Sequence, residues 1–391
     1  MKNRTDLLAR RALRLSRVCL ISCAVFALVA LAAVPAEAQQ RVGSPEDGRA
    51  SDPPTLRRGV RNILGGVPMT AADSMHQRVV RLLEFDSYKE LVRGLTQFGD
   101  REQGTARNAA AVDWIEEKLR GWGYETGRLH YMYTPDADEG AEPPAPEPRE
   151  EVYATKIGST NPGEMYIISA HMDGRGGGEA ANDDGSGTAL VMEIARALAS
   201  PGVQSDVSIR FALWNNEETG LDGATAYVEQ RAELQGIESP AGSGQYPEPR
   251  WLGMIQHDMM MWDHGNPVTF NQALDADVDV EFQLNSAFAG QSAQLGLVLI
   301  NANRLHATDY PAVLSNAMSN TDSTPFMDLV PAVSLRENRR LYETGNGANP
   351  HWHQTTDLFE TFTDADFTLG LNAAQTTLGA LAKLAGIRIT H

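Results

Sequence analysis

The chain has 391 residues, with 33 Lys and Arg against 51 Asp and Glu, and a formal net charge of −18 at pH 7. This length is enough for one large domain or two small ones, and a hydrophobic fraction of 42% is that of an ordinary globular protein. The negative charge argues against nucleic acid or an anionic membrane surface as a partner.

The first 38 residues differ from the rest of the chain. Basic residues precede an apolar run over residues 18–34, and a small-x-small pattern follows, ending at Ala38. This order predicts a cleavable signal peptide, whereas a membrane anchor would need about 20 apolar residues. We therefore expect cleavage after Ala38 and a periplasmic or secreted protein without a stable membrane partner. Cleavage would remove six basic and two acidic residues, which would move the formal charge from −18 to −22.

Residues 39–72 carry scattered Pro, Gly and charge without a sustained period, which predicts an extended lead-in to a single domain over residues 73–391. Apolar side chains recur at helical spacing in residues 74–96, and residues 105–120 form a second amphipathic helix. The Pro-rich, acidic segment 134–151 cannot continue a helix or occupy a central strand, so we expect a surface loop there.

Further along the chain, short apolar runs alternate with helical patterns. Helices are predicted over residues 186–199 and 220–235. The apolar runs that we interpret as strands cover residues 165–170, 207–214, 251–256, 295–300 and 332–335. This alternation is typical of an α/β sheet with helices on both faces.

Polar residues that suit a metal centre come directly after these apolar runs, where open α/β sheets bind their ligands. His171 and Asp173 follow the first run, and a glycine-rich stretch then leads to Asp183 and Asp184. A neutral imidazole and a carboxylate suit Zn²⁺, and Asp173 could hold the other ring nitrogen of His171. The alternative is that Asp183 or Asp184 only caps the helix that follows.

Two further acidic motifs follow later strands. Glu217 and Glu218 come soon after the run over residues 207–214, where neighbouring side chains point in different directions, so one can bind metal while the other handles protons. The alternative is a solvated helix start, where acidic residues are favoured. Asp258 follows His257 after the next run, and alternation along an extended segment leaves only one of these two as a ligand.

The last motif is NPHWHQTTD, at residues 349–357. His351 and His353 could share a face of an extended segment, so spacing alone does not choose between them, and a surface histidine is the alternative for either. Taken in chain order, the His, Asp, Glu, Asp and His of the four motifs form a series that is hard to attribute to coincidence.

Together these motifs resemble those of the co-catalytic zinc aminopeptidases and carboxypeptidases of the M28 type. The resemblance covers roughly residues 80–385. It is carried by FGDREQGTARNAAAVDWI (98–115), SAHMDG (169–174), AANDDGSGTA (180–189), FALWNNEETGLDGATAYV (211–228), QHDMM (256–260), TDSTPF (321–326) and NPHWHQTTD (349–357). With the alternation described above, we expect a three-layer α/β sandwich with a central mixed, mostly parallel sheet and helices on both faces.

The resemblance implies two Zn²⁺ ions per chain and a role for each motif. It makes Asp183 the carboxylate that bridges both metals. His171 and Asp258 would complete one metal site, and Glu218 and His353 the other. Glu217 would be the general base, and Asp173 the acid that orients His171. His353 is preferred to His351 because it stands four residues before Asp357 in the family's H-x-x-x-D pattern.

The chain departs from the family pattern at one motif. Many members have Ser-Asp-His where this chain has Thr321, Asp322 and Ser323, so any role of that histidine in substrate binding is absent or reassigned. All five ligand positions and the base are present.

The resemblance implies an exported zinc-dependent exopeptidase with peptides as substrates. An aminopeptidase comes first, because the catalytic region has no long inserted domain and compact members commonly trim N-termini. A dipeptidase or carboxypeptidase on the same di-zinc centre is the alternative. A non-catalytic binding protein should have lost ligands or the base, and a single-zinc cyclase should lack the complete five-ligand set. The sequence leaves the oligomeric state open.

Overall fold

The computed structural model describes residues 69–137, 142, 144–262, 278–307, 309–337 and 349–390. All of them belong to one compact unit, Asp52–His391. The predicted signal peptide and residues 39–68 of the predicted lead-in lie outside the described residues. No helix among the described residues combines the length and the apolar character that a bilayer-spanning segment needs.

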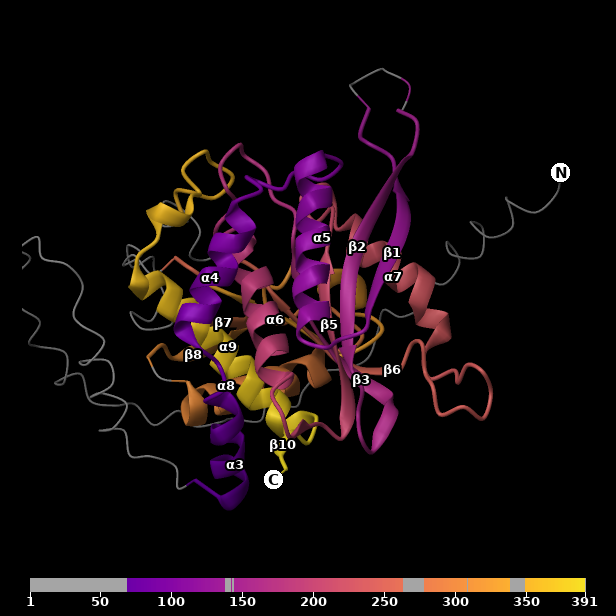
Figure 1. Ribbon diagram of the computed structural model, residues 1–391, viewed down its shortest axis with the longest axis vertical. Coiled ribbons are helices and arrows are strands. Elements are labelled where there is room, and N and C mark those ends of the chain that lie inside the picture. The colour runs from indigo at the N-terminus through magenta and orange to yellow at the C-terminus, as the bar shows by residue number, and fades with distance from the viewer. Residues whose placement is uncertain are drawn as a thin grey trace, which may run out of the picture. The chain divides into compact units, whose positions relative to one another are not determined.

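An eight-stranded mixed sheet forms the centre of this unit (Figure 1). In spatial order its strands are β1 (Thr126–Tyr133), β2 (Glu147–Lys156), β5 (Val207–Trp214), β3 (Asn161–His171), β6 (Arg250–His257), β9 (Ala332–Arg336), β7 (Val278–Glu281) and β8 (Ala312–Ser315). The four central strands β5, β3, β6 and β9 run parallel to one another, whereas β2 and β7 join them in the antiparallel sense. The four central strands therefore end at the same edge of the sheet.

Helices cover both faces of the sheet, as the alternation of buried side chains along β3 requires. Ile168 packs in one apolar core and its neighbour Ile167 in the other. The first core includes α3 (Ala71–Val80), α4 (Phe85–Thr96), α5 (Ala106–Gly121), α6 (Gly185–Leu198), α8 (Ala289–His306) and α9 (Asp364–Leu384). The second includes α7 (Asp222–Arg231) and Phe326 of the 3-10 helix Thr324–Phe326. In Figure 1, α4, α5 and α6 lie toward the viewer and α7 lies behind β1 and β2. The predicted fold class is confirmed.

The remaining elements are short. They are the paired strands β4 (Val203–Gln204) and β10 (Arg388–Ile389), and the 3-10 helices Ala232–Leu234 and Phe359–Thr361.

The helical pattern over residues 74–96 forms two helices rather than one. Helix α3 begins at Ala71, inside the predicted lead-in, because Thr70 and Asp73 form a capping box. Helix α4 begins at Phe85, after a break. There the buried carboxylate of Glu193 on α6 accepts hydrogen bonds from the backbone N–H of Glu84 at 2.7 Å and from the Ser87 hydroxyl at 2.6 Å. This cap comes from a distant part of the chain, so local spacing could not predict the break.

Two other predictions about secondary structure are wrong. The apolar run over residues 295–300 lies inside helix α8 and is not a strand, because a short apolar run cannot be distinguished from a buried helix by its period alone. The predicted loop 134–151 ends early, since β2 begins at Glu147. Pro148 is tolerated in this strand because β5 pairs only with residues 152–156, so β2 has a partner on one side alone at Pro148.

Candidate metal centre

The parallel strands bring the predicted ligands to one edge of the sheet. His171 is the last residue of β3, Asp258 follows β6, and the two adjacent glutamates follow β5. The ligands form two donor groups, and within each group one ligand atom of every residue lies within 4.8 Å of the others. The first donor group is His171, Glu217 and Asp258, and the second is Asp183, Glu218 and His353. All five predicted ligands and the predicted base therefore lie in these two donor groups.

Asp183 belongs to the second donor group and also lies close to the first. Its Oδ1 is 3.2 Å from Nε2 of His171, and its Oδ2 is 3.1 Å from Nε2 of His353. The same nitrogen of His353 is 2.9 Å from Oε2 of Glu218, while Nε2 of His171 is 3.9 Å from Oδ1 of Asp258. Each oxygen of the Asp183 carboxylate thus faces one imidazole, which is the arrangement that a bridging ligand needs.

Asp184 has the capping role that the sequence left open for either aspartate. Its Oδ1 accepts hydrogen bonds from the backbone N–H groups of Gly187, at 2.9 Å, and Met259, at 3.1 Å. Its Oδ2 accepts one from the backbone N–H of His171 at 3.2 Å. The carboxylate therefore caps α6 and ties it to the ends of β3 and β6. The peptide bond between Asp183 and Asp184 is cis.

His257 points away from the centre, as alternation along the strand predicts for one of the pair. Its Nδ1 donates to the carbonyl oxygen of Ser169 at 3.0 Å, and its Nε2 accepts from the Thr377 hydroxyl at 2.8 Å. Burial lowers the pKa of His257 to about 4, so the ring is neutral at pH 7. Asp258 is thus the member of the pair that reaches the donor groups.

His353, and not His351, reaches the centre. The Nδ1 of His351 lies 2.9 Å from the Thr356 hydroxyl, and its ring packs edge-on against Trp262. The backbone of His353 has a left-handed φ of +54°, and this residue passes close to Gly176. A Cβ on Gly176, whose φ is +98°, would lie 2.5 Å from the carbonyl carbon of His353. The glycine-rich stretch therefore leaves room for the loop that carries His353 to approach.

Asp173 contacts His171 through its backbone more closely than through its carboxylate. The Nδ1 of His171 donates to the Asp173 carbonyl oxygen at 3.0 Å and lies 3.6 Å from Oδ1. The carboxylate accepts hydrogen bonds from the backbone N–H groups of Glu217 and Glu218 at 3.2 and 3.4 Å. Asp173 therefore contacts the imidazole of His171 mainly through its backbone, while its carboxylate binds the backbone of the two glutamates.

The centre contains more buried acid than base. Burial and the nearby charge of Asp183 raise the pKa of Glu218 to about 7, and burial raises the pKa of Glu217. Burial also opposes ionisation of Asp183, but hydrogen bonds with His171 and His353 outweigh it and lower that pKa to about 2. The buried Oε1 of Glu218 has no hydrogen-bond partner in the described part of the chain. Imidazole and carboxylate donors with an excess of negative charge fit divalent cations such as zinc.

Comparison with known proteins agrees with this geometry. Residues 152–374 match the sequence profile of "Peptidase family M28", which is more than half of the chain. The chain belongs to this family. The predicted family is thereby confirmed.

Curated proteins similar to this M28 chain match it over short segments. Leupeptin-inactivating enzyme 1 of Streptomyces exfoliatus is 29% identical over 143 residues, which is 35% of this chain and 30% of that protein. A probable zinc metalloprotease of Leptosphaeria maculans is 30% identical over 175 residues, 41% of this chain and 40% of that protein. Aminopeptidase YwaD of Bacillus subtilis is 41% identical over 72 residues, 18% of this chain and 15% of that protein. The matches thus span less than half the length of these relatives.

Solved structures share the fold of this M28 chain. A zinc aminopeptidase from Bacillus subtilis has a TM-score of 0.61 at 14% identity, over 78% of this chain and 96% of that chain. The glutaminyl cyclase of Porphyromonas gingivalis has a TM-score of 0.56 at 20% identity, over 78% of this chain and 99% of that chain. At these identities the likeness concerns the fold alone.

Arg336 is a residue of the M28 centre that the sequence did not reveal. This buried side chain ends β9, and its Nη1 lies 2.5 Å from Oδ2 of Asp258, which also accepts a hydrogen bond from the Thr321 hydroxyl at 2.7 Å. Burial opposes ionisation of Asp258, but the charge of Arg336 keeps its pKa below the ordinary value. Arg336 directly follows a predicted strand, as His171 does, and this position in the sequence could have identified it as a residue of the centre. Thr321, from the motif that departs from the family pattern, therefore supports a predicted ligand.

Two further residues hold the loop that carries Asp183. Asp357 accepts hydrogen bonds from the backbone N–H groups of Asn182 and Asp183 at 2.9 and 3.1 Å. Arg101, which is fully buried, donates to backbone carbonyl groups at both ends of the glycine-rich stretch. These include the carbonyl of Met172 at 2.8 Å and those of residues 179 and 180 at 2.7 Å each. The position of Asp183 is therefore fixed by two residues that lie outside the donor groups.

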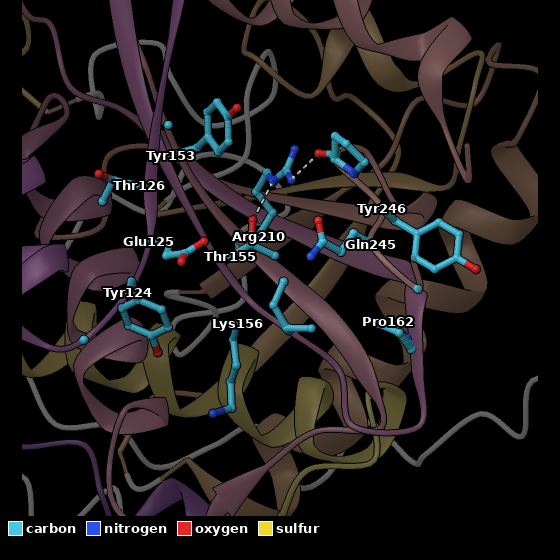
Figure 2. A pocket seen from close by; sticks show the side chains of 15 residues that line it. Tyr124, Glu125, Thr126, Tyr153, Thr155, Lys156, Pro162, Arg210, Gln245 and Tyr246 are labelled. Carbon is cyan, nitrogen blue, oxygen red and sulfur yellow. Dashed lines mark hydrogen bonds between the residues drawn. The ribbon is translucent and has the colours of Figure 1, made fainter. Parts of the chain in front are cut away.

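A cavity of about 680 Å³ lies away from this centre (Figure 2). Pro162, near the start of β3, and Arg210, midway along β5, line it, whereas the donor groups lie beyond the ends of these strands. Figure 2 shows the hydrogen bond of 3.0 Å from Arg210 to the Thr155 hydroxyl. Arg210 also forms an ion pair of 2.5 Å with Glu248, so its charge is already balanced. No residue of the two donor groups lines this cavity.

Without metal, the protein should lose stability as the pH rises through about 7 and then about 9. Burial raises the pKa of Glu218 to about 7. Burial opposes protonation of His353, but hydrogen bonds with Asp183 and Glu218 raise its pKa to about 9. Each group binds its proton more tightly in the folded than in the unfolded chain. Its contribution is therefore complete below the unfolded pKa and lost as the pH passes the folded value.

Zinc bound to Glu218 and His353 would take the place of these protons, so the difference in Tm between the zinc-loaded and the chelated protein should widen over this pH range. Thermal denaturation with and without chelator, at a series of pH values, measures this difference. A constant difference would show that neither group gives up a proton to the metal.

Proposed function

We propose that the protein is an exported, zinc-dependent exopeptidase that removes N-terminal residues from peptides. One observation carries the proposal: the two oxygens of the Asp183 carboxylate lie 3.2 and 3.1 Å from the imidazoles of the two donor groups. This geometry supports two zinc ions that share one carboxylate. The donor set of two imidazoles and buried carboxylates is typical of zinc enzymes that hydrolyse peptide bonds.

The chain's own residues provide the proton transfer. When bound, zinc would polarise the scissile carbonyl and lower the pKa of a bound water molecule. Glu217 is a member of the first donor group, and its backbone N–H donates to the Asp173 carboxylate at 3.2 Å, which holds it in place. From there it takes the proton of the attacking water and passes it to the leaving amine. Glu217 has no other assigned role in the centre.

The charge of the centre favours an N-terminal amine over a C-terminal carboxylate. Zinc would neutralise the carboxylates that bind it, but the buried Asp173 and Asp322 close to the donor groups are not among the predicted ligands, and a substrate ammonium would be attracted to such carboxylates. Arg336, the buried cation of the centre, already pairs with Asp258. The aminopeptidases of Bacillus subtilis and Pseudomonas aeruginosa among the similar proteins, at 41% and 42% identity over 72 residues, also support this preference.

One residue favours a dipeptidase or carboxypeptidase as the second candidate. The Nε of Arg175 lies 3.9 Å from Oε2 of Glu218, and the Arg175 side chain is 53% exposed. A half-exposed guanidinium at this position could receive the carboxylate of a substrate. The complete set of ligands and base gives no support to a non-catalytic binding protein.

Substrates blocked at one end separate the two candidates. We expect the protein to release product from an aminoacyl anilide and to leave an N-blocked dipeptide intact, both before and after Arg175→Gln. Cleavage of the blocked dipeptide, lost in Arg175→Gln, would instead establish the second candidate. If neither substrate reacts with the zinc-loaded protein, the exopeptidase proposal fails.

Export is the part of the proposal that depends on the sequence alone. The basic, apolar and small-residue order of the first 38 residues supports it. N-terminal sequencing of the protein recovered outside the cytoplasm should begin at Gln39. A mature protein that retains residues 1–38 would contradict cleavage.

A further inference from the structure

A separate group of potential metal ligands lies where α3 meets the end of α8. Asp73 and His76 stand three residues apart on α3, and His306 is the last residue of α8. One ligand atom of each lies within 4.8 Å of the others, and the two imidazole rings have centroids 6.3 Å apart. None of the three belongs to the donor groups of the metal centre.

The hydrogen bonds of these residues leave ligand atoms available. Asp73 caps α3 with Oδ2 alone, which accepts from the backbone N–H and the hydroxyl of Thr70 at 2.8 and 2.7 Å. Its Oδ1 and the ring of His76 form no hydrogen bond with any described residue. The Nδ1 of His306 donates to the Gln77 side-chain oxygen at 3.1 Å, so the lone pair of this ring lies on Nε2. A ring whose other nitrogen donates to an oxygen is typical of metal-binding histidines.

The surroundings hold the His306 ring in place. His306 is 3% exposed, and a Cβ on Gly379 of α9 would lie 2.7 Å from its Cδ2, so only glycine leaves room for the ring. The C-terminal end of α8 favours a cation, while the N-terminal end of α3 opposes one. Lys383 on α9 also acts on His76, but its side chain is exposed to solvent, which screens its charge.

We propose that Asp73, His76 and His306 bind a divalent cation of the zinc type, separate from any metal at the centre, and that this cation fastens α3 to α8. Two imidazoles and one carboxylate are common zinc donors, and they leave a fourth position for water. Only Val79 and Val80 are buried in α3, so apolar packing holds this helix weakly. A metal bound between the helices would therefore contribute to the attachment of α3.

Zinc titration of the protein with a loaded metal centre tests the proposal without reference to activity. We expect wild type to bind one more zinc per chain than His76→Gln in isothermal titration, with the difference repeated in metal analysis. We choose His76 for substitution because its ring is partly exposed and forms no hydrogen bond with any described residue. His130→Gln is the matched control, since His130 lies on β1 with its side chain 72% exposed, outside the group. It should bind zinc as wild type does.

Thermal denaturation gives a second readout. Added zinc should raise the Tm of wild type and of His130→Gln more than that of His76→Gln. Asp73→Asn, which keeps an acceptor for Thr70, should behave as His76→Gln does, and circular dichroism checks that both variants are folded. Equal binding isotherms in wild type and these two variants would overturn the proposal.

Discussion

Replacing Glu217 with glutamine should remove nearly all peptide hydrolysis and leave the zinc content of the protein unchanged. The amide has the same shape as the carboxylate but cannot take a proton from water. General acid–base catalysis typically contributes about 10²–10⁴-fold to a rate, so we expect kcat to fall by about that factor. Turnover of an aminoacyl anilide and metal analysis of the same preparation measure the two quantities.

The control for this variant is Glu229→Gln, because Glu229 is an exposed glutamate on α7. It should retain both activity and zinc. Normal turnover in Glu217→Gln would remove Glu217 from the mechanism. Loss of one zinc ion would show instead that Glu217 is a ligand in the group that it shares with His171 and Asp258.

Replacing Asp183 with alanine should abolish metal binding together with activity. Each oxygen of this carboxylate faces one donor group, so its removal takes a ligand from both. The remaining carboxylates would repel one another without a cation between them. We expect the purified variant to contain less than one zinc ion per chain and no measurable turnover.

Asp364→Ala is a suitable control, since the Asp364 side chain on α9 is 75% exposed. It should keep its metal and its activity. If Asp183→Ala retained both zinc ions, Asp183 would not be the bridging ligand, and the arrangement of the two donor groups would need another explanation.

Much of the fold could be predicted because local patterns determine it. The strand over residues 207–214 has the predicted bounds, since this run is apolar at almost every position and is buried on both faces. What could not be predicted depends on distant residues. The break before α4 requires Glu193. The prediction for the run at residues 295–300 is wrong for another reason, because a short apolar run fits a buried helix as well as a strand.

The residues of the metal centre also divide into those that local patterns predict and those that depend on distant parts of the chain. The alternation that separates Asp258 from His257 is local, and the structure places one of the two, Asp258, in a donor group. The choice of His353 over His351 is not local, because it depends on a left-handed backbone that fits against Gly176. The ion pair between Arg336 and Asp258 joins the ends of two strands, and no spacing within the sequence reveals it.

The order of the ligands along the chain has a consequence for biosynthesis. The last member of the first donor group is Asp258, whereas the second group requires His353, which lies much further along the chain. Proteins are made from the N-terminus, so a nascent or truncated chain that stops before residue 353 can assemble at most the first group. With one zinc ion in each donor group, as proposed, the hydrolase would take up its second metal only after synthesis of the chain has passed residue 353.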